Sequence, residues 1–588
     1  MIVLTLSRIV YGAEDQVFDL DPIVVHKSSK GSFGKYSLDY QRLNELPFGS
    51  LVEALGLEPV DLQSRSLQGG IQSDFSMRGS TFQGVLVLVN GQRLNDPQTG
   101  HHNSDLPFTS EDIDSININP GVNSAILGPD AIGGAIDFKI KQPQEKKRVL
   151  EFRLGNYQTR SWLFSLSDKI NKLGVRFSFQ NQESSGFHED TDYKNITSGF
   201  SSSLEVPDGR LNTYFGYQDK EFGAYDFYTP NKGYPSKEWT RTYLLSNVLD
   251  LDRDGLIIKP GFLWRRHYDK FMLDKTQVRS NYLNHHRTDM FTPNIYFQNQ
   301  FDPIGRMGLG LEYGQEKITS TNLGKHSRNH ESIFLDQNKE FTPRVSLDLS
   351  GRYDHYDSFD KSYTGTAGIK YKIIQAGTLH FDISRSIRVP SFTELYYSDP
   401  TTLGDVNLAP EKAINYQLGL DYQKKEVSLG GSVFLRQEKN LIDWVKTSAS
   451  QAKWQAENIS GSDVLGLEGS LNYELNDYLK IAANYTYVNK RTNEDNYIYK
   501  YGPNYCRHLA NAEMEFKSPW GKQVLSFSYK KKPLRRGWFL MDMHLAYNIK
   551  KMSEVFFNIT NLFNVEYQEI EGIPQPGRYI EGGLRLTW

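Results

Sequence analysis

A period of two in apolar and polar positions dominates the chain beyond about residue 145. It is clearest in four segments: residues 416–422, 427–435, 465–475 and 479–487. In the first of them, the apolar residues Leu418 and Leu420 flank Gly419. The polar dipeptide Asn476-Asp477 separates the last two segments and is typical of a tight turn. Because successive side chains of a β-strand point to opposite faces, this pattern predicts strands of about ten residues paired as hairpins.

A soluble sandwich or propeller would also alternate in this way, but three features favour a membrane barrel. The apolar face often ends in Tyr, Phe or Trp, as an aromatic girdle at a membrane interface requires. The opposite face carries Gly, Ser, Asn, Glu and Arg, which are too polar for a sandwich core. The final segment, residues 580–588, resembles the C-terminal strand by which outer-membrane barrels are recognised, so barrel assembly machinery is an expected partner. Its apolar face consists of Ile580, Leu584, Leu586 and Trp588.

Residues before about 140 have a different pattern, which predicts a small α/β domain. Ser50 and Glu53 form a capping box at the start of a short helix, and Asn90-Gly91 is a tight-turn dipeptide. Further strands are predicted at residues 85–89, 112–118 and 135–140. The series of predicted hairpins runs from residue 144 to residue 588. At roughly 20 residues per strand with its connection, this length predicts about 22 antiparallel strands. A barrel that wide would leave an open lumen, so we interpret the N-terminal domain as its plug.

Composition excludes several other classes of protein. Hydrophobic residues make up only 38% of the chain and aromatic residues 13%, and no run of about 18 apolar residues exists, which excludes a bundle of membrane helices. The net charge of −3 gives no field that would favour nucleic acid as a partner. The single cysteine, Cys506, cannot form an internal disulfide or a cysteine-based metal site.

Several colinear motifs are similar to those of TonB-dependent outer-membrane receptors. In the plug they are residues 75–79, 85–94, 116–121 and 128–137, and in the barrel residues 388–390, 394–396, 407–411 and 561–567. Where the family usually has an arginine before a glycine, this chain has Pro120 before Gly121. The resemblance implies a monomeric receptor of the bacterial outer membrane that imports a scarce nutrient actively, and not an enzyme. It also implies a mainly β fold, with an antiparallel transmembrane β-barrel and an α/β plug domain inside its lumen.

The N-terminal residues predict export and an energy-coupling segment. Residues 1–13 resemble a signal peptide, although Arg8 interrupts the apolar core; a disordered or strand-forming N-terminus is the alternative. A second segment resembles the TonB box, which the family offers to TonB and its inner-membrane energising complex: Asp21, Pro22, Ile23, Val24 and Val25. A β-branched run after a proline could add to a sheet edge of a partner, or form a further plug strand. The predicted organisation is a signal peptide (1–13), a periplasmic extension (14–40), a plug (41–143) and a barrel (144–588).

Two plug arginines, Arg78 and Arg93, are predicted to contact carboxylates on the inner wall of the barrel. For Arg78 the resemblance implies this role, and for Arg93 its charge suggests it. Glu468 and Glu474 lie on the polar face of one predicted strand and are eligible partners. Solvated plug charges are the alternative.

Candidate substrate contacts fall in three segments. The turn-rich plug segment 95–103 supplies Asn95, Asp96, Gln98, His101 and His102. An aromatic loop supplies Tyr225, Phe227 and Tyr228, and a third group consists of residues 265–268 with His285 and His286. Paired histidines suggest metal or haem, but adjacent residues of a strand point to opposite faces. Whether these histidines bind a metal, and which one, therefore stays open.

The cobalamin receptor branch is the most similar in size, box and plug, so cobalamin is the expected small-molecule substrate. A ferric siderophore is the alternative substrate. Haem is less favoured, because haem receptors of this family typically place a histidine in the region that corresponds to Val389–Leu408, and this chain has none there. A passive porin or an adhesin would explain the predicted β-strands, but neither the plug domain nor the segment that resembles the TonB box. No cofactor is expected, although Asp190 and Asp192 could help to hold calcium in an extracellular loop.

Overall fold

The structure is a computed structural model that describes residues 36–121, 124–277, 283–492, 496–502, 504–550 and 552–588. The predicted signal peptide and TonB box therefore lie outside the described residues. None of the helices in these residues has the length and the run of apolar side chains that a transmembrane helix needs.

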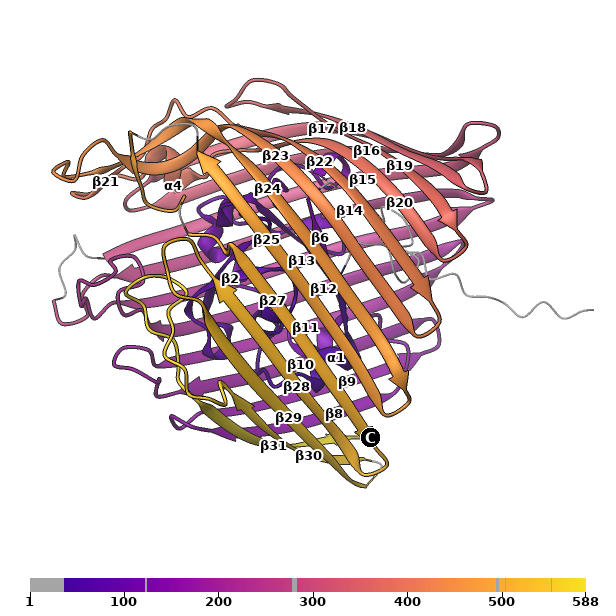
Figure 1. Ribbon diagram of the computed structural model, residues 1–588, viewed down its shortest axis with the longest axis horizontal. Coiled ribbons are helices and arrows are strands. Elements are labelled where there is room, and N and C mark those ends of the chain that lie inside the picture. The colour runs from indigo at the N-terminus through magenta and orange to yellow at the C-terminus, as the bar shows by residue number, and fades with distance from the viewer. Residues whose placement is uncertain (1–35, 122–123, 278–282, 493–495, 503, 551) are drawn as a thin grey trace, which may run out of the picture.

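In the described part of the chain, 22 antiparallel strands form a closed barrel (Figure 1). They are β8 (Lys147–Gly155), β9 (Arg160–Ile170), β10 (Leu173–Ser184), β11 (Tyr193–Val206), β12 (Gly209–Gly223), β13 (Lys237–Arg253), β14 (Leu256–Met272), β15 (Leu283–Phe301), β16 (Gly305–Ser320), β17 (Gly324–Thr342), β18 (Val345–Tyr356), β19 (Ser362–Ile374), β20 (Gly377–Arg388), β22 (Glu411–Lys424), β23 (Val427–Lys446), β24 (Trp454–Asn476), β25 (Leu479–Thr492), β27 (His508–Ser518), β28 (Gly521–Lys531), β29 (Trp538–Lys550), β30 (Ser553–Thr560) and β31 (Tyr579–Thr587). The short strands β21 (Thr402–Leu403) and β26 (Ile498–Tyr499) pair with the long strands β24 and β23, and helix α4 (Phe392–Tyr396) lies in the connection before β22.

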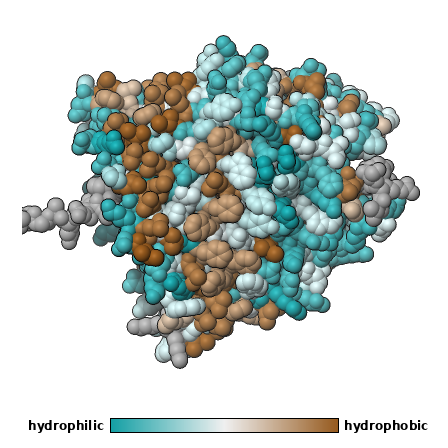
Figure 2. Space-filling model, turned by 180° about the vertical axis from the view of Figure 1, so that it is seen from behind, coloured by the Kyte–Doolittle hydropathy of each residue, from teal (hydrophilic) through white to brown (hydrophobic). Residues whose placement is uncertain are grey.

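The strands alternate as their sequence predicts. On β24, Leu465 and Leu467 are 49% and 48% exposed on the outer wall, whereas Glu468 is 5% exposed and faces the lumen. Figure 2 shows the result on one face, where hydrophobic side chains form a band with hydrophilic surface on either side. Such a band matches the apolar core of a bilayer.

The first and last strands of the barrel close it. Strand β31 pairs with β8 from Glu581↔Gly155 to Thr587↔Val149, and the backbones of Arg148 and Trp588 hydrogen bond to each other. Long connections such as residues 389–410 lie at one end of the barrel, which we call the outer end (Figure 1).

The remaining described elements form the plug, which lies inside the barrel (Figure 1). Its sheet has the order β1-β6-β7-β4-β5, and β2 and β3 form a separate pair. The plug strands are β1 (Tyr36–Asp39), β2 (Asp61–Ser66), β3 (Gln72–Ser76), β4 (Val85–Val89), β5 (Gln92–Arg93), β6 (Ile113–Pro120) and β7 (Gly134–Ile140). Its helices are α1 (Tyr40–Glu45), α2 (Leu51–Ala54), α3 (Ser124–Leu127) and the 3-10 helices η1 (Leu55–Leu57), η2 (Gln68–Gly70), η3 (Phe82–Gly84), η4 (Gly100–Ser104) and η5 (Ser110–Asp112). This arrangement confirms the predicted fold class.

Local sequence explains several plug elements. Ser50 Oγ accepts the Glu53 N–H at 3.2 Å, which starts α2 where the capping box predicted a helix. Asn90 and Gly91 both adopt positive φ, at 50° and 78°, which allows the two-residue turn between β4 and β5. Strand β4 is buried along its length, as its continuous apolar run requires.

Candidate functional site

The plug segment 95–103 lies between the plug sheet and the barrel wall. Asn95 anchors it, because its side chain accepts the Val87 N–H at 2.7 Å and donates to the Val85 carbonyl at 2.9 Å. Asp96 Oδ1 accepts the Gln98 N–H at 2.8 Å and thereby closes a turn. These hydrogen bonds attach the start of the segment to strand β4.

The five predicted substrate contacts of this segment are all buried. Their exposed fractions are 4% for Asn95, 4% for Asp96, 4% for Gln98, 8% for His101 and 2% for His102. In this structure they contact the rest of the plug and the barrel wall, so a direct contact with substrate stays a prediction.

His101 belongs to a buried ion-pair network inside the plug. Its Nδ1 lies 2.7 Å from Asp74 Oδ1, and Arg65 lies 2.8 Å from the other oxygen of that carboxylate. Burial alone would raise the pKa of Asp74, but Arg65 and His101 lower it to about 2. Burial also lowers the pKa of His101 to about 4, and its ring stacks on Phe82 with centroids 4.2 Å apart.

The barrel wall meets Asp96 and Asp105 of the plug with side chains from β12 and β14. Arg265 on β14 forms an ion pair with Asp96. His267 Nε2, also on β14, lies 2.9 Å from Asp105 Oδ2, and Lys220 on β12 lies 2.5 Å from Asp105 Oδ1. These pairs join the plug to two separate parts of the wall.

His102 lies between two carboxylates. Its Nδ1 is 3.4 Å from Asp105 Oδ2, and its Nε2 is 3.4 Å from Asp269 Oδ2. Burial opposes protonation, but these two carboxylates raise the pKa of His102 well above its ordinary value. Two sets of side chains have potential ligand atoms within 4.8 Å of one another: His102, Asp105 and His267, and His102, Glu238 and Asp269.

Sequence reasoning found some of these wall residues and missed others. Arg265 and His267 belong to the predicted third group, and the same alternation also brings Asp269 to the inner face. His285 is exposed and His286 buried, as expected for adjacent residues of a strand. The residues missed were Asp105, Lys220, Glu238 and Asp269.

The predicted aromatic loop packs on the plug. Phe227 is 2% exposed and its carbonyl accepts Arg65 Nε at 3.0 Å. Tyr228 Oη accepts Gln72 Nε2 at 2.7 Å, and burial raises the pKa of this phenol well above its ordinary value. Tyr225 is partly exposed and lies 4.8 Å from the His188 ring. Tyr225 and Tyr228 are both partly exposed, whereas Phe227 is buried.

Arg78 joins the plug to the barrel. Its Nε and Nη2 donate to the Glu468 carboxylate at 2.9 and 2.6 Å, and its Nη1 donates to Gln417 at 2.7 Å. The guanidinium lies 4.3 Å from the centre of the Phe434 ring. Arg436 on the barrel donates to the Arg78 carbonyl at 3.0 Å.

Arg93 has one partner in each domain. It lies 2.5 Å from Asp130 within the plug and 3.7 Å from Glu316 on the barrel. Glu474, the second eligible wall carboxylate, pairs with Lys480 at 2.5 Å, and its side chain is 61% exposed.

The two acidic residues considered for calcium lie at the outer end. Asp190 is buried and forms an ion pair with Lys275, and Asp192 lines a separate cavity of about 330 Å³. In this structure Lys275 already neutralises the charge of Asp190, so a calcium ion would have to displace it. Calcium binding at this loop stays a prediction.

A larger cavity of about 810 Å³ opens beside the outer loops between β28 and β31. Four basic side chains line it, against two acidic ones: Lys500, Lys532, Arg535 and Arg536, against Glu566 and Glu571. Tyr499, Trp538 and Tyr567 add aromatic surface. Aromatic walls with a surplus of positive charge suit a large, partly anionic solute.

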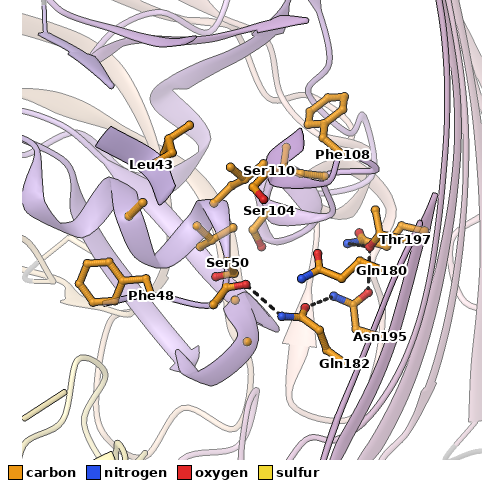
Figure 3. A pocket seen from close by; sticks show the side chains of 18 of the residues that line it. Leu43, Phe48, Ser50, Ser104, Phe108, Ser110, Gln180, Gln182, Asn195 and Thr197 are labelled. Carbon is orange, nitrogen blue, oxygen red and sulfur yellow. Dashed lines mark hydrogen bonds between the residues drawn. The ribbon is translucent and has the colours of Figure 1, made fainter. Parts of the chain in front are cut away.

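A smaller gap of about 50 Å³ separates α1 and α2 from the wall of β10–β12 (Figure 3). Amide and hydroxyl side chains line its barrel side, including Gln180, Gln182, Asn195 and Thr197. Gln182 donates to the Gly49 carbonyl at 2.9 Å. This polar gap has room for a few water molecules.

Comparisons with known proteins give a consistent result. Residues 32–135 match the family model described as TonB-dependent Receptor Plug Domain, and residues 138–562 match TonB dependent receptor-like, beta-barrel. The vitamin B12 transporter BtuB of Vibrio vulnificus is 24% identical over 70% of this chain and 68% of its own length. The iron-regulated outer membrane virulence protein of Vibrio cholerae is 22% identical over 88% of this chain and 87% of its own length.

Solved structures share the fold. A mutant of the ferric enterobactin receptor of Pseudomonas aeruginosa, in complex with enterobactin, superposes with a TM-score of 0.79 at 16% identity, covering 95% of this chain and 100% of its own. The siderophore receptor PirA of Acinetobacter baumannii gives a TM-score of 0.79 at 14% identity, with 95% and 98% covered.

Proposed function

The chain belongs to the TonB-dependent receptor family of the outer membrane, and we propose that it imports cobalamin with energy supplied through TonB. It is a receptor and not an enzyme. Residues 21–25 are the proposed contact with TonB, and the inner-membrane complex supplies the work. Substrate binding at the outer end starts the cycle, and traction on the N-terminal segment displaces part of the plug.

The observation that supports energised import is the way in which the plug is held. It fills the lumen and is tied to the wall by buried ion pairs, among them Arg78–Glu468, Lys220–Asp105 and Arg265–Asp96. Withdrawing one partner of a buried ion pair while the other charge stays buried costs about 3–5 kcal/mol. Thermal motion alone would therefore open the plug rarely, and a substrate-driven cycle needs an external source of work.

Binding outside must also be reported to the periplasmic side. A ligand can shift the plug between two states only if it binds them with different affinity. Asp96 and Asp105 of the plug carry several of the interdomain ion pairs, with Arg265, Lys220 and His267 of the barrel. A shift of the segment 95–105 would loosen several of them together.

Cobalamin is supported by the similarity to vitamin B12 transporters over two thirds of the chain. A ferric siderophore is the second candidate, and the outer cavity favours it. Its lining has more basic than acidic side chains and three aromatic rings, which is the chemistry expected for an anionic iron chelate.

The test is uptake of radiolabelled cobalamin and of a labelled ferric catecholate by cells that express this receptor alone. A matched pair of variants at the proposed box isolates the energy coupling. Val24→Pro removes a main-chain donor needed for strand addition, whereas Val24→Thr keeps both the donor and the β-branch. We expect Val24→Pro to bind ligand normally and to lose uptake, and Val24→Thr to keep both.

Two results would contradict the proposal. Uptake by the Val24→Pro variant at the wild-type rate would indicate passive flow. Binding of the catecholate but not of cobalamin would replace the first substrate by the second and leave the energised mechanism in place.

A further inference from the structure

Four side chains from four different elements converge just inside the outer end of the barrel. His102 comes from the plug helix η4, Glu238 from β13, Asp269 from β14 and His286 from β15. All are buried, with exposed fractions of 2%, 0%, 5% and 7%. Nitrogen and oxygen donors of this kind are the usual protein ligands of divalent transition metals.

The spacing of these donors is close to that of a metal centre. Asp269 Oδ2 lies 3.4 Å from His102 Nε2 and 4.0 Å from His286 Nε2. One donor atom each of His102, Glu238 and Asp269 lies within 4.8 Å of the others. In a tetrahedral site with bonds of about 2.0–2.1 Å, ligand atoms are about 3.3 Å apart. Small rotations of the side chains would therefore complete the centre.

The charges of the cluster are not balanced by permanent cations. Among the residues that the structure describes, Glu238 and Asp269 have no Lys or Arg within ion-pair distance. Glu238 accepts the Tyr228 hydroxyl at 3.2 Å, and Asp269 Oδ2 accepts Gln98 Nε2 at 3.0 Å. Asp269 Oδ1 has no hydrogen-bond partner within the described chain. A proton on His102 offsets one of these two buried carboxylates. A divalent cation that displaces this proton would neutralise both.

The neighbouring carboxylate Asp105 is arranged to orient His102. Its Oδ2 lies 3.4 Å from His102 Nδ1, on the opposite side of the ring from Asp269, and Lys220 neutralises its Oδ1. Metal-binding histidines usually donate their second ring nitrogen to such a carboxylate. Because Asp105 is already paired with Lys220, the set with Glu238 and Asp269 is the better cation site of the two.

We propose that Glu238, Asp269, His102 and His286 bind one divalent transition-metal ion, with Zn²⁺ the best match to two imidazoles and two carboxylates. The ion takes the place of the Gln98 amide hydrogens, which now donate to Asp269. It ties the plug helix η4 to three adjacent barrel strands and so fastens the outer part of the plug. This role is separate from the nutrient that the receptor imports.

The test uses the full-length receptor in detergent after treatment with a chelator. Isothermal titration calorimetry with Zn²⁺ should give one site per chain, and Co²⁺ should give the visible absorption of a tetrahedral complex. Ca²⁺ and Mg²⁺ should bind far more weakly, because they prefer oxygen ligands. Zn²⁺ should also slow hydrogen exchange in residues 95–105.

Variants identify the ligands. Loss of an outer hydrogen-bond partner of a metal ligand costs about 10–100-fold in affinity. Glu238→Gln with Asp269→Asn, and separately His102→Gln, remove ligands themselves and should each weaken Zn²⁺ binding by at least that factor. The matched control is Asp250→Asn, which removes a buried carboxylate from the same strand as Glu238 but outside the cluster. Heat-modifiability on gels establishes that each variant still forms the barrel.

Absence of Zn²⁺ binding by the chelated wild type would overturn the proposal. So would equal binding by the wild type and by a folded variant that lacks both carboxylates, because the ion would then sit elsewhere. Neither result would bear on nutrient uptake, so failure here is distinguishable from failure of the proposed transport function.

Discussion

Replacing Glu468 by glutamine is expected to loosen the plug. The change leaves the Arg78 guanidinium in place without its counter-ion. Both side chains are almost completely buried, with exposed fractions of 2% for Arg78 and 1% for Glu468, so water cannot compensate the lost charge. Removal of one partner of such a pair costs about 3–5 kcal/mol, which raises the population of plug-open molecules roughly 100- to 4,000-fold.

The assay is hydrogen exchange of the plug peptides that contain β3 and β4, measured in lipid nanodiscs. Glu474→Gln is the matched control, because it makes the same substitution on the same strand at an exposed pair with Lys480. Exposed pairs contribute little to stability, so exchange in this variant should equal that of the wild type.

A third variant separates charge from packing. When Arg78→Met is combined with Glu468→Leu, no buried charge is left alone, and much of the protection should return. If Glu468→Gln and Glu474→Gln exchange alike, the Arg78 pair does not hold the plug and the reasoning fails.

Other perturbations test the outer loop, the outer cavity and the plug helix. Asp226→Ala removes acceptors for three backbone N–H groups of the loop 225–236 and should make it sensitive to protease, whereas unchanged cleavage would show that packing alone holds it. Lys500→Ser with Arg536→Ser should weaken binding of an anionic ferric chelate more than that of cobalamin, measured by fluorescence quenching; equal losses would refute a charge-selective cavity. Burial raises the pKa of Glu53 from 4.5 to about 7, so the folded plug keeps a proton that the unfolded chain loses, and stability should fall as the pH rises through this window. Exchange of the α2 amides, corrected for the intrinsic rate, should show this slope, and Glu53→Gln should abolish it.

The barrel was predictable because its signal repeats. Alternation places Leu465 and Leu467 on the lipid side and Glu468 in the lumen, and the same rule applies along other strands such as β11. The plug strands were predictable from local chemistry, such as the Asn90-Gly91 turn. In both cases the information lies within a few neighbouring residues.

The partners of the buried charges were not predictable in the same way. Glu468 and Glu474 share a face of one strand, but only Glu468 lies at the height of Arg78. The position of a wall residue along the barrel axis relative to the plug depends on the shear of the barrel and on where the plug lies in the lumen. No local sequence pattern encodes either of them.

The cluster around His102 illustrates the same limit. His102 could be singled out because it lies in a polar turn, but its neighbours Glu238 and Asp269 come from two other strands. Their convergence depends on the register of β13 against β14 and on the rotation of the plug. Alternation could have selected Asp269 as a lumen residue, but not as a neighbour of His102.

The meeting of β8 with β31 dictates an order of events during biogenesis. Translation delivers the plug first and strand β31 last, so the barrel stays open until β31 pairs with β8. We expect the plug, which is synthesised before β31, to be enclosed when β31 pairs with β8. Mutations that weaken the short pairing of β8 with β31, which ends at Val149 and Thr587, should yield barrels that are open or lack the plug more readily than misfolded plugs.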